Sequence, residues 1–250
     1  MEGLLVSTLT PAAAQATLAC AEASIYVLFT WISAWNSTLG AVQARFAPCS
    51  AFAYSTLNGG GTVVVSASHC FTNGSNSAAI DATRLALARE TRVKCRLLKT
   101  FPASDSAVLR CEDAAPPLRR TLRAPVFAQA AVAAGFFKGP VSNYPPTLSV
   151  HDDFAMHVLS SSIAVFLGPV TAKWAAPGGG SLPRTRAQSS FGMLQGRVLQ
   201  GMSGGPVLDV HCGVVGIISA FSTNTVFGAL DEVDAWLQHE DWAAPLGLMM

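Results

Sequence analysis

Short apolar runs separated by turn-forming residues make up most of the chain after residue 40, and this alternation limits the folds open to it. The runs include GTVVVSAS (61–68), VKCRLLKTF (93–101) and GVVGIISAF (213–221). Stretches rich in glycine, proline and asparagine lie between them, such as LNGGG (57–61) and KGPVSNYPP (138–146). Many short strands joined by turns form sandwiches or barrels, whereas alternating strands and helices form a parallel sheet. The pattern therefore predicts an all-β protein.

A proline- and arginine-rich stretch near the middle of the chain divides this pattern into two parts. The stretch is DAAPPLRRTLRAP (113–125), a composition typical of linkers. We therefore expect one β unit at 37–124 and a second at 125–250. A terminal helix packed on the second unit is expected from apolar residues at helical spacing, namely Leu230, Val233, Trp236 and Leu237.

The N-terminal segment 1–36 is unusually apolar, and we interpret it as a leader or anchor. Glu22 interrupts the apolar stretch 12–35, and the uninterrupted run 23–35 is shorter than the ~20 residues that span a bilayer as a helix. Three alternatives stay open. Residues 12–35 could form a targeting or membrane-associated segment, a helix packed on the domain, or a poorly ordered leader.

The chain carries little charge, which bears on the partners it could bind. Only 12% of the residues are charged, and the formal net charge is +1. Basic residues cluster at 84–96 and 119–123, but no aromatic residues are interleaved with them as a nucleic-acid platform would need. We interpret both clusters as solvated surface and expect no nucleic-acid partner.

The six cysteines are spaced in a way that argues against a metal or redox site. None forms a C-x-x-C pair, so neither a zinc ribbon nor a thioredoxin-like site is expected. If Cys20 leaves with a leader, Cys212 is the expected free thiol. His151 and His157 flank two aspartates, but a lone H-x5-H pattern in a loop is usually exposed polar sequence. No metal and no cofactor are expected.

A candidate nucleophile lies in QGMSGGPVLD (200–209), where glycine and proline surround Ser203. Glycines permit the backbone angles of a tight loop and the close approach of a substrate. Such a loop can direct the backbone N–H groups of Gly201 and Ser203 into one concavity. Two donors placed in this way would form an oxyanion hole, in which a single good donor contributes ~3–4 kcal/mol to transition-state stabilisation.

A serine nucleophile needs a base, and the base needs an orienting group. His69 ends VVVSASHC (63–70), a β-branched run that leads into a short loop. Asp105 precedes the apolar run of residues 107–109, so its side chain could point inward and accept the imidazole N–H. The other two acidic candidates, Asp81 in a polar loop and Asp113 in the linker, fit less well.

These three motifs together resemble those of the chymotrypsin/trypsin-like serine proteases. The family's A-A-H-C, D-[IV]-A-L-L and G-D-S-G-G-P motifs match at 67–70, 105–109 and 201–206, in the family's order His, Asp, Ser. The resemblance implies two six-stranded antiparallel β-barrels of the chymotrypsin type with a C-terminal helix. It also implies a disulfide between Cys49 and Cys70 that braces the histidine loop.

The resemblance implies a serine endopeptidase that hydrolyses peptide bonds through an acyl-enzyme, with a polypeptide as substrate. The triad would be His69, Asp105 and Ser203, and the two barrels would form one protease unit.

The chain departs from trypsin itself in its activation signals. It has no Ile-Val-Gly-Gly-like segment, and Met202 stands where trypsin has the acid that pairs with the new N-terminal amine. We therefore expect no trypsin-type zymogen activation and a closer similarity to the HtrA-like and viral branches. No PDZ domain is expected after the terminal helix.

Four residues are candidates for the pocket that would hold the substrate side chain preceding the scissile bond. They are Arg197, Ser219, Ala220 and Phe221. Arg197 would favour acidic substrate residues, whereas the ring of Phe221 would favour small or apolar ones. We lean toward the second preference.

Two other functions stay open. One is a non-catalytic, protease-like binding module. The other is a viral polyprotein-processing protease with the apolar N-terminus as a membrane tether. For the compartment, a secretory, extracellular or membrane-associated location is favoured over a cytoplasmic one.

Overall fold

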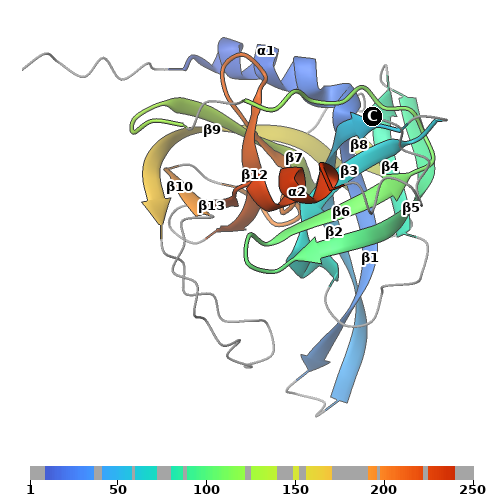
Figure 1. Cartoon of the computed structure of the whole chain (residues 1–250). Helices are drawn as coiled ribbons and strands as arrows, with labels where there is room; N and C mark the ends of the chain where they lie inside the picture. Colours follow the sequence, from blue (N-terminus) through green and yellow to red (C-terminus); the bar gives the residue numbers. More distant parts are fainter. Residues whose placement is uncertain are drawn as a thin grey trace, which may run out of the picture.

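The computed structural model describes residues 9–36, 41–57, 60–71, 80–86, 89–121, 125–139, 149–151, 156–170, 191–195, 198–221 and 225–239. Its first half contains α1 (Pro11–Ala21), η1 (Glu22–Ser24), β1 (Ile25–Asn36), β2 (Ala41–Thr56), β3 (Thr62–Ala67), η2 (Ser68–Phe71), β4 (Ile80–Ala86), β5 (Arg89–Phe101) and β6 (Ser106–Cys111). Its second half contains β7 (Ala130–Gly139), β8 (Ser149–His151), β9 (Met156–Val170), β10 (Phe191–Gln195), β11 (Pro206–Leu208), β12 (Val214–Phe221), β13 (Thr225–Gly228) and α2 (Asp231–Leu237). Strands dominate both halves (Figure 1).

The first six strands close into an antiparallel barrel in the order β1-β2-β3-β6-β5-β4. Strand β3 is buried along its whole length, and its apolar side chains alternate between two cores. Val64 packs inside the barrel, whereas Val63 and Val65 pack in the core shared with the second half of the chain. Because side chains on both faces of β3 are buried, its sequence is an almost unbroken apolar run.

The second half forms a seven-stranded antiparallel sheet in the order β10-β13-β12-β11-β7-β9-β8. An additional pairing of β10 with β9 joins six of these strands into a ring, and β8 lies outside it along β9. Strand β7 alternates in the same way as β3. Val132 faces the shared core, and Ala131 and Ala133 face the interior of the second barrel. The expected chymotrypsin-type architecture is confirmed, with β8 as an additional strand.

Residues 25–36 were expected to belong to a leader or anchor, and they are instead the first strand of the first barrel. They pair with β2 from Ile25↔Phe52 to Asn36↔Ala41. The preceding helix α1 also belongs to the fold, because Leu18 and Ala21 are buried in the shared core. No helix among the described residues is long and apolar enough to span a membrane.

A disulfide between Cys20 and Cys212 attaches α1 to the turn between β11 and β12. A free Cys212 was expected only if Cys20 left with a leader, and here the two cysteines are joined. A second disulfide joins Cys95 and Cys111, which face each other across β5 and β6. The third joins Cys49 and Cys70, the pair that the resemblance implied.

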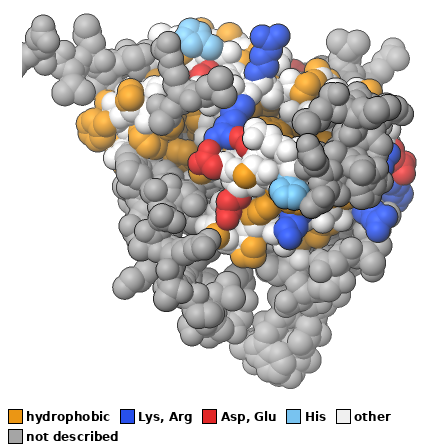
Figure 2. Space-filling model, viewed as in Figure 1, with side chains coloured by type: hydrophobic (Ala, Val, Ile, Leu, Met, Phe, Trp, Pro, Cys, Tyr) orange, Lys and Arg blue, Asp and Glu red, His pale blue; other side chains and the backbone are white. Residues whose placement is uncertain are grey.

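Helix α2 packs across the two halves rather than on the second half alone. Val233 is buried in the shared core, and the Trp236 ring lies edge-on to Phe101 of β5, with 6.2 Å between ring centroids. Asp234 accepts a hydrogen bond from the hydroxyl of Tyr54 in β2 and pairs with Arg120 of the linker. On the face shown in Figure 2, the described acidic and basic side chains are interspersed among apolar ones.

Candidate active site

The candidate catalytic residues come from three loops that meet where the two halves of the chain pack together. His69 lies in η2, directly after β3, and Asp105 lies in the turn before β6. Ser203 lies in the loop before β11 and contributes to the opposite side of the interface. The carbonyl oxygen of Ser203 accepts a 2.7 Å hydrogen bond from the backbone N–H of Ser50 in β2, so this loop is tied to the first barrel.

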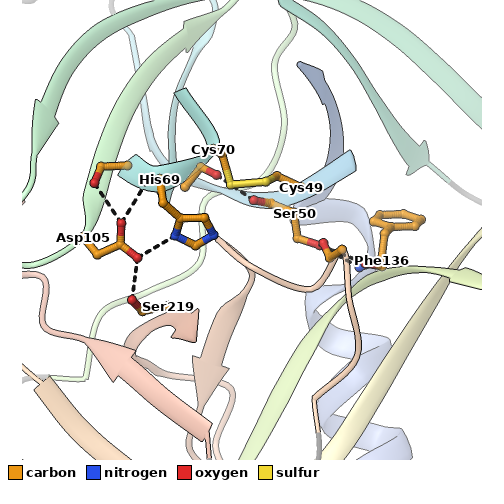
Figure 3. The surroundings of a disulfide bond; sticks show 10 residues. Cys49, Ser50, His69, Cys70, Asp105, Phe136 and Ser219 are labelled. Atoms are coloured by element: carbon orange, nitrogen blue, oxygen red, sulfur yellow. Dashed lines mark hydrogen bonds and ion pairs between the residues drawn. A yellow bond between two sulfur atoms is a disulfide. The ribbon is translucent and has the colours of Figure 1, made fainter. Parts of the chain in front are cut away.

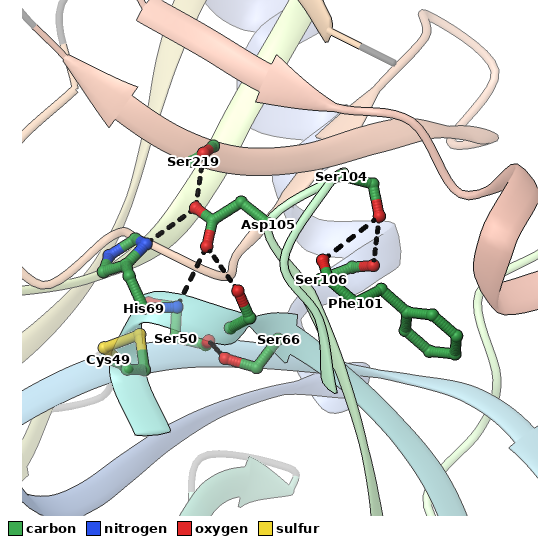
Figure 4. A network of polar contacts seen from close by, with 11 residues as sticks. Cys49, Ser50, Ser66, His69, Phe101, Ser104, Asp105, Ser106 and Ser219 are labelled. Carbon is green, nitrogen blue, oxygen red and sulfur yellow. Dashed lines mark hydrogen bonds and ion pairs between the residues drawn. A yellow bond between two sulfur atoms is a disulfide. The ribbon is translucent and has the colours of Figure 1, made fainter. Parts of the chain in front are cut away.

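The Asp105 carboxylate is buried, with 2% of the residue exposed, and hydrogen-bond donors surround it (Figure 4). Its Oδ2 lies 2.7 Å from Nδ1 of His69 and also accepts the hydroxyl proton of Ser219. Its Oδ1 accepts the backbone N–H of His69 at 2.9 Å and the hydroxyl proton of Ser68 at 2.8 Å. An ionised carboxylate has acceptor sites for all four donors, so each of them is satisfied.

This arrangement determines the tautomer of His69. An ionised carboxylate only accepts, so Nδ1 is the donor in this contact, and in a neutral imidazole the lone pair then lies on Nε2. The side chain of His69 is 27% exposed, so a substrate can approach it. The result is an imidazole held in a defined orientation at the edge of the first barrel.

Asp105 has a backbone conformation that few residue types adopt. Its φ is 50°, in the left-handed region, where aspartate and asparagine are the most frequent non-glycine residues. The turn from Pro102 leads into this conformation, and the Asp105 carbonyl accepts the backbone N–H of Ser68. The carboxylate is thus presented to η2 by both backbone and side-chain contacts.

The loop that carries Ser203 is a series of tight turns. The N–H of Met202 donates to the Leu199 carbonyl at 3.1 Å, with Gly201 at a φ of 102°. Gly204 has a φ of 85°, and a Cβ there would lie 2.1 Å from the Ser50 carbonyl oxygen. Only glycine satisfies both the angle and the space at these two positions.

Three donor groups of this loop have no partner within the described part of the chain. They are the backbone N–H groups of Gly201 and Ser203 and the Ser203 hydroxyl. Bonds between a catalytic serine and its base are often long before substrate binds, so the missing contact with His69 does not argue against this pairing.

Met202 fills the position where trypsin has an acid. Its side chain is buried, with 1% of the residue exposed, and its sulfur accepts the backbone N–H of Leu199 at 3.3 Å. The apolar side chain of Met202 therefore packs this loop onto the core of the second barrel.

The structure describes the predicted pocket residues only in part. Ser219 is buried and its hydroxyl donates to Asp105, so its side chain supports the carboxylate. Its place in a substrate pocket stays a prediction. Ala220 and Phe221 lie in β12, opposite Val226 and Thr225, and their side chains are outside the described part. Arg197 also lies outside the described residues.

The sulfur atoms of Cys49 and Cys70 and a ring nitrogen of His69 lie within 4.8 Å of one another (Figure 3). The two cysteines are joined as a disulfide, so their sulfurs are not thiolates and do not offer a metal site.

The sequence interpretation missed Ser68, whose hydroxyl donates to the Asp105 carboxylate, and Ser50, whose backbone N–H donates to the Ser203 carbonyl. The only signal available was that each adjoins a motif residue.

Comparisons with known proteins identify the family and the fold. A family model described as "trypsin-like peptidase domain" matches residues 49–217, more than half of the chain. A search of curated proteins found no match.

Several solved structures of a protease from M. tuberculosis, Rv3671c, share the fold. Its active form superposes with a TM-score of 0.65 at 16% identity, covering 97% of this chain and 89% of that one. An inactive form gives a TM-score of 0.61 at 17% identity, covering 96% and 98% of the two chains. A serine-to-alanine mutant in the inactive form gives 0.59 at 17% identity, covering 96% and 95%. With this fold and the match to the family model, the chain belongs to the family of trypsin-like peptidases.

Proposed function

We propose that the chain is a serine endopeptidase in which Ser203, His69 and Asp105 act as the catalytic triad. Ser203 would be the nucleophile and His69 the general base. Asp105 would hold the imidazole in the required tautomer, and the backbone N–H groups of Gly201 and Ser203 would form the oxyanion hole. Both barrels are needed, because they supply opposite sides of this site.

The observation that carries the proposal is the 2.7 Å contact between Nδ1 of His69 and the buried carboxylate of Asp105. A carboxylate in this position would accept the Nδ1 proton and stabilise the imidazolium that forms when the base takes a proton. The two N–H groups without an acceptor on the Ser203 loop supply the complementary requirement for acyl transfer.

In this mechanism, Nε2 of His69 removes the proton of the Ser203 hydroxyl as Oγ attacks the carbonyl carbon of the peptide bond. The negative charge on the carbonyl oxygen is bound by the two N–H groups. His69 then gives the proton to the leaving amine, which leaves an ester on Ser203. Water attacks this ester with the same base, which releases the acid and restores the serine.

We propose that this site does not require trypsin-type cleavage for activity. In trypsin a buried ion pair with a new N-terminus stabilises the active loop. Here the loop has the apolar Met202 in that place, together with turn hydrogen bonds that need no charged partner.

The first experiment is labelling with a fluorophosphonate probe, followed by mass spectrometry to locate the adduct. We expect the wild-type protein to be labelled at Ser203 and the Ser203→Ala and His69→Ala variants to remain unlabelled. Circular dichroism of both variants verifies that the fold is intact.

Absence of labelling in a folded wild-type protein would refute the proposal and favour a non-catalytic binding module. Labelling at another serine would refute the assignment of Ser203. Incubation of the labelled and unlabelled proteins with casein then tests whether a polypeptide is the substrate.

A further inference from the structure

Ser50 is a fully buried polar residue to which the proposed mechanism gives no role. It lies in β2 next to Cys49, with 0% of its surface exposed. Figure 3 shows its side chain pointing from the first barrel toward Phe136 of the second. Burying an unpaired hydroxyl is costly, so the partners of this one indicate its role.

The Ser50 hydroxyl bridges two backbone groups of the second half. Its Oγ accepts the N–H of Phe136 at 2.8 Å and lies 2.8 Å from the carbonyl oxygen of Gly201. The Phe136 carbonyl is farther away, at 3.4 Å. A hydroxyl has one proton, so this proton goes to the nearer acceptor, the Gly201 carbonyl.

The backbone of Ser50 makes a second hydrogen bond to the loop that carries Ser203. Its N–H donates to the carbonyl oxygen of Ser203 at 2.7 Å. Its own carbonyl accepts the hydroxyl of Ser66 at 2.7 Å, which fixes it within the first barrel. One residue thus holds the carbonyls of both residues whose N–H groups would bind the oxyanion.

Two of the residues packed closely against Ser50 are glycines. A Cβ at Gly135 would lie 2.8 Å from the Ser50 hydroxyl oxygen, and one at Gly204 would lie 2.1 Å from its carbonyl oxygen. Two glycines therefore provide the space in which the serine contacts the loop.

We propose that Ser50 is a positioning residue that holds the Gly201–Ser203 loop with its two N–H groups directed toward the substrate. The inference rests on the proposed function. Gly201, at a φ of 102°, has a backbone that can rotate easily. Anchoring its carbonyl restricts this rotation and so keeps the adjoining N–H groups aligned, which is the condition for oxyanion stabilisation.

The test compares Ser50→Ala with the matched control Thr62→Ala. Thr62 is also 0% exposed, and its hydroxyl likewise accepts a backbone N–H, from Ala115, and donates to a backbone carbonyl, that of Asp113. Neither partner belongs to the Ser203 loop. Both variants lose an equivalent buried hydroxyl, so we expect similar decreases in melting temperature.

Only Ser50→Ala should impair chemistry. The limiting rate of fluorophosphonate labelling and the acylation burst with p-nitrophenyl acetate should both fall at least ~10-fold, since a fully lost donor costs ~10²–10³. The half-saturating probe concentration and the apparent pKa of the pH–rate profile should stay unchanged, because His69 and Asp105 are untouched. Thr62→Ala should remain within ~2-fold of wild type, and Ser50→Thr, which restores a hydroxyl, should recover most of the rate.

Equal rates for Ser50→Ala and Thr62→Ala would overturn the inference, as would a change confined to the half-saturating concentration. If Ser50→Ala does not fold, Ser50→Gly removes the same hydroxyl and is measured in the same way with the same expectation. A wild-type protein that does not react at Ser203 overturns the proposed function and this inference with it. A reactive wild type with no specific effect at Ser50 overturns this inference alone.

Discussion

At the scale of single residues, Asp105 is the side chain whose surroundings are most completely specified. Every group that contacts its two oxygens is a donor, and two of these donors belong to His69. We expect Asp105→Asn to reduce kcat by about 10⁴-fold, the loss that this change causes in the chymotrypsin-type triad. The amide NH2 would face the Nδ1 proton and favour the wrong tautomer.

The measurement is the burst rate with p-nitrophenyl acetate together with the melting temperature. Ser219→Ala is a suitable companion, because it removes one donor but leaves the carboxylate and the contact with His69. It should lose far less activity than Asp105→Asn. A loss below 10-fold in Asp105→Asn would show that Asp105 does not orient the base.

Two glycines separate the cost of backbone strain from the cost of crowding. Gly60 and Gly204 both have left-handed φ angles, 97° and 85°. A Cβ on Gly60 would meet nothing within 4 Å, whereas one on Gly204 would lie 2.1 Å from the Ser50 carbonyl oxygen and 2.8 Å from the Ala67 nitrogen.

Gly60→Ala should therefore lower the free energy of unfolding by about 1–2 kcal/mol, from strain alone. Gly204→Ala should cost about 1–3 kcal/mol more, because backbone atoms must move, and it should abolish labelling of Ser203. Urea denaturation of both variants measures the difference. Equal losses of unfolding free energy in the two variants would mean that the Ser203 loop can move to accommodate the added Cβ.

At the scale of elements, α1 depends on few contacts within itself. Thr10 caps its first turn through Ala13, and Pro11 begins it, but an isolated helix of 11 residues is marginal in water. Its stability comes from the burial of residues such as Leu18 and from the Cys20–Cys212 disulfide.

Replacement of both Cys20 and Cys212 by alanine should lower the free energy of unfolding by about 3–5 kcal/mol, since the disulfide closes a long loop. Amide hydrogen exchange should accelerate most within residues 11–21. Replacing Cys95 and Cys111, separated by 16 residues, is the control for a short loop and should leave exchange in α1 unchanged. Equal acceleration in both variants would mean that α1 is not held by its own disulfide.

At the scale of the whole molecule, local patterns predicted an all-β protein and the candidates His69, Asp105 and Ser203, whereas the two-barrel architecture was implied by the resemblance of the three motifs. Strand β3 could be recognised from its β-branched run, and Ser203 from the glycines around it. The run 25–36 was misassigned because an apolar strand of a barrel resembles a short anchor in composition alone. The contacts of Ser50 and Ser219 could not be predicted, because each involves a partner from a distant part of the chain.

The two halves are also linked by a polar cluster outside the active site, formed by Tyr54 of β2, Arg120 of the linker and two aspartates of α2. Tyr54 donates to Asp234, which pairs with Arg120, and Arg120 also contacts Asp231 at 2.5 Å. Burial raises the pKa of Tyr54 above its ordinary value of 10.0. Arg120 opposes this shift, and the negative charge of Asp231 adds to it.

This cluster predicts how stability depends on alkaline pH. A phenol whose pKa is higher in the folded than in the unfolded protein stabilises the fold below pH ~10, and this contribution is lost as pH rises through the folded pKa. We therefore expect Tyr54→Phe to be less stable than wild type at pH 8 by about 1.5–3 kcal/mol, the contribution of a hydrogen bond to a charged group. The difference should shrink as pH rises above 10, because the ionised phenolate of the wild type no longer donates and would lie beside the Asp234 carboxylate. Urea denaturation of both proteins from pH 8 to pH 11 measures this difference. If it stays constant or grows with pH, Tyr54 is not held in its neutral, donating form by the contacts that join α2 to the first barrel.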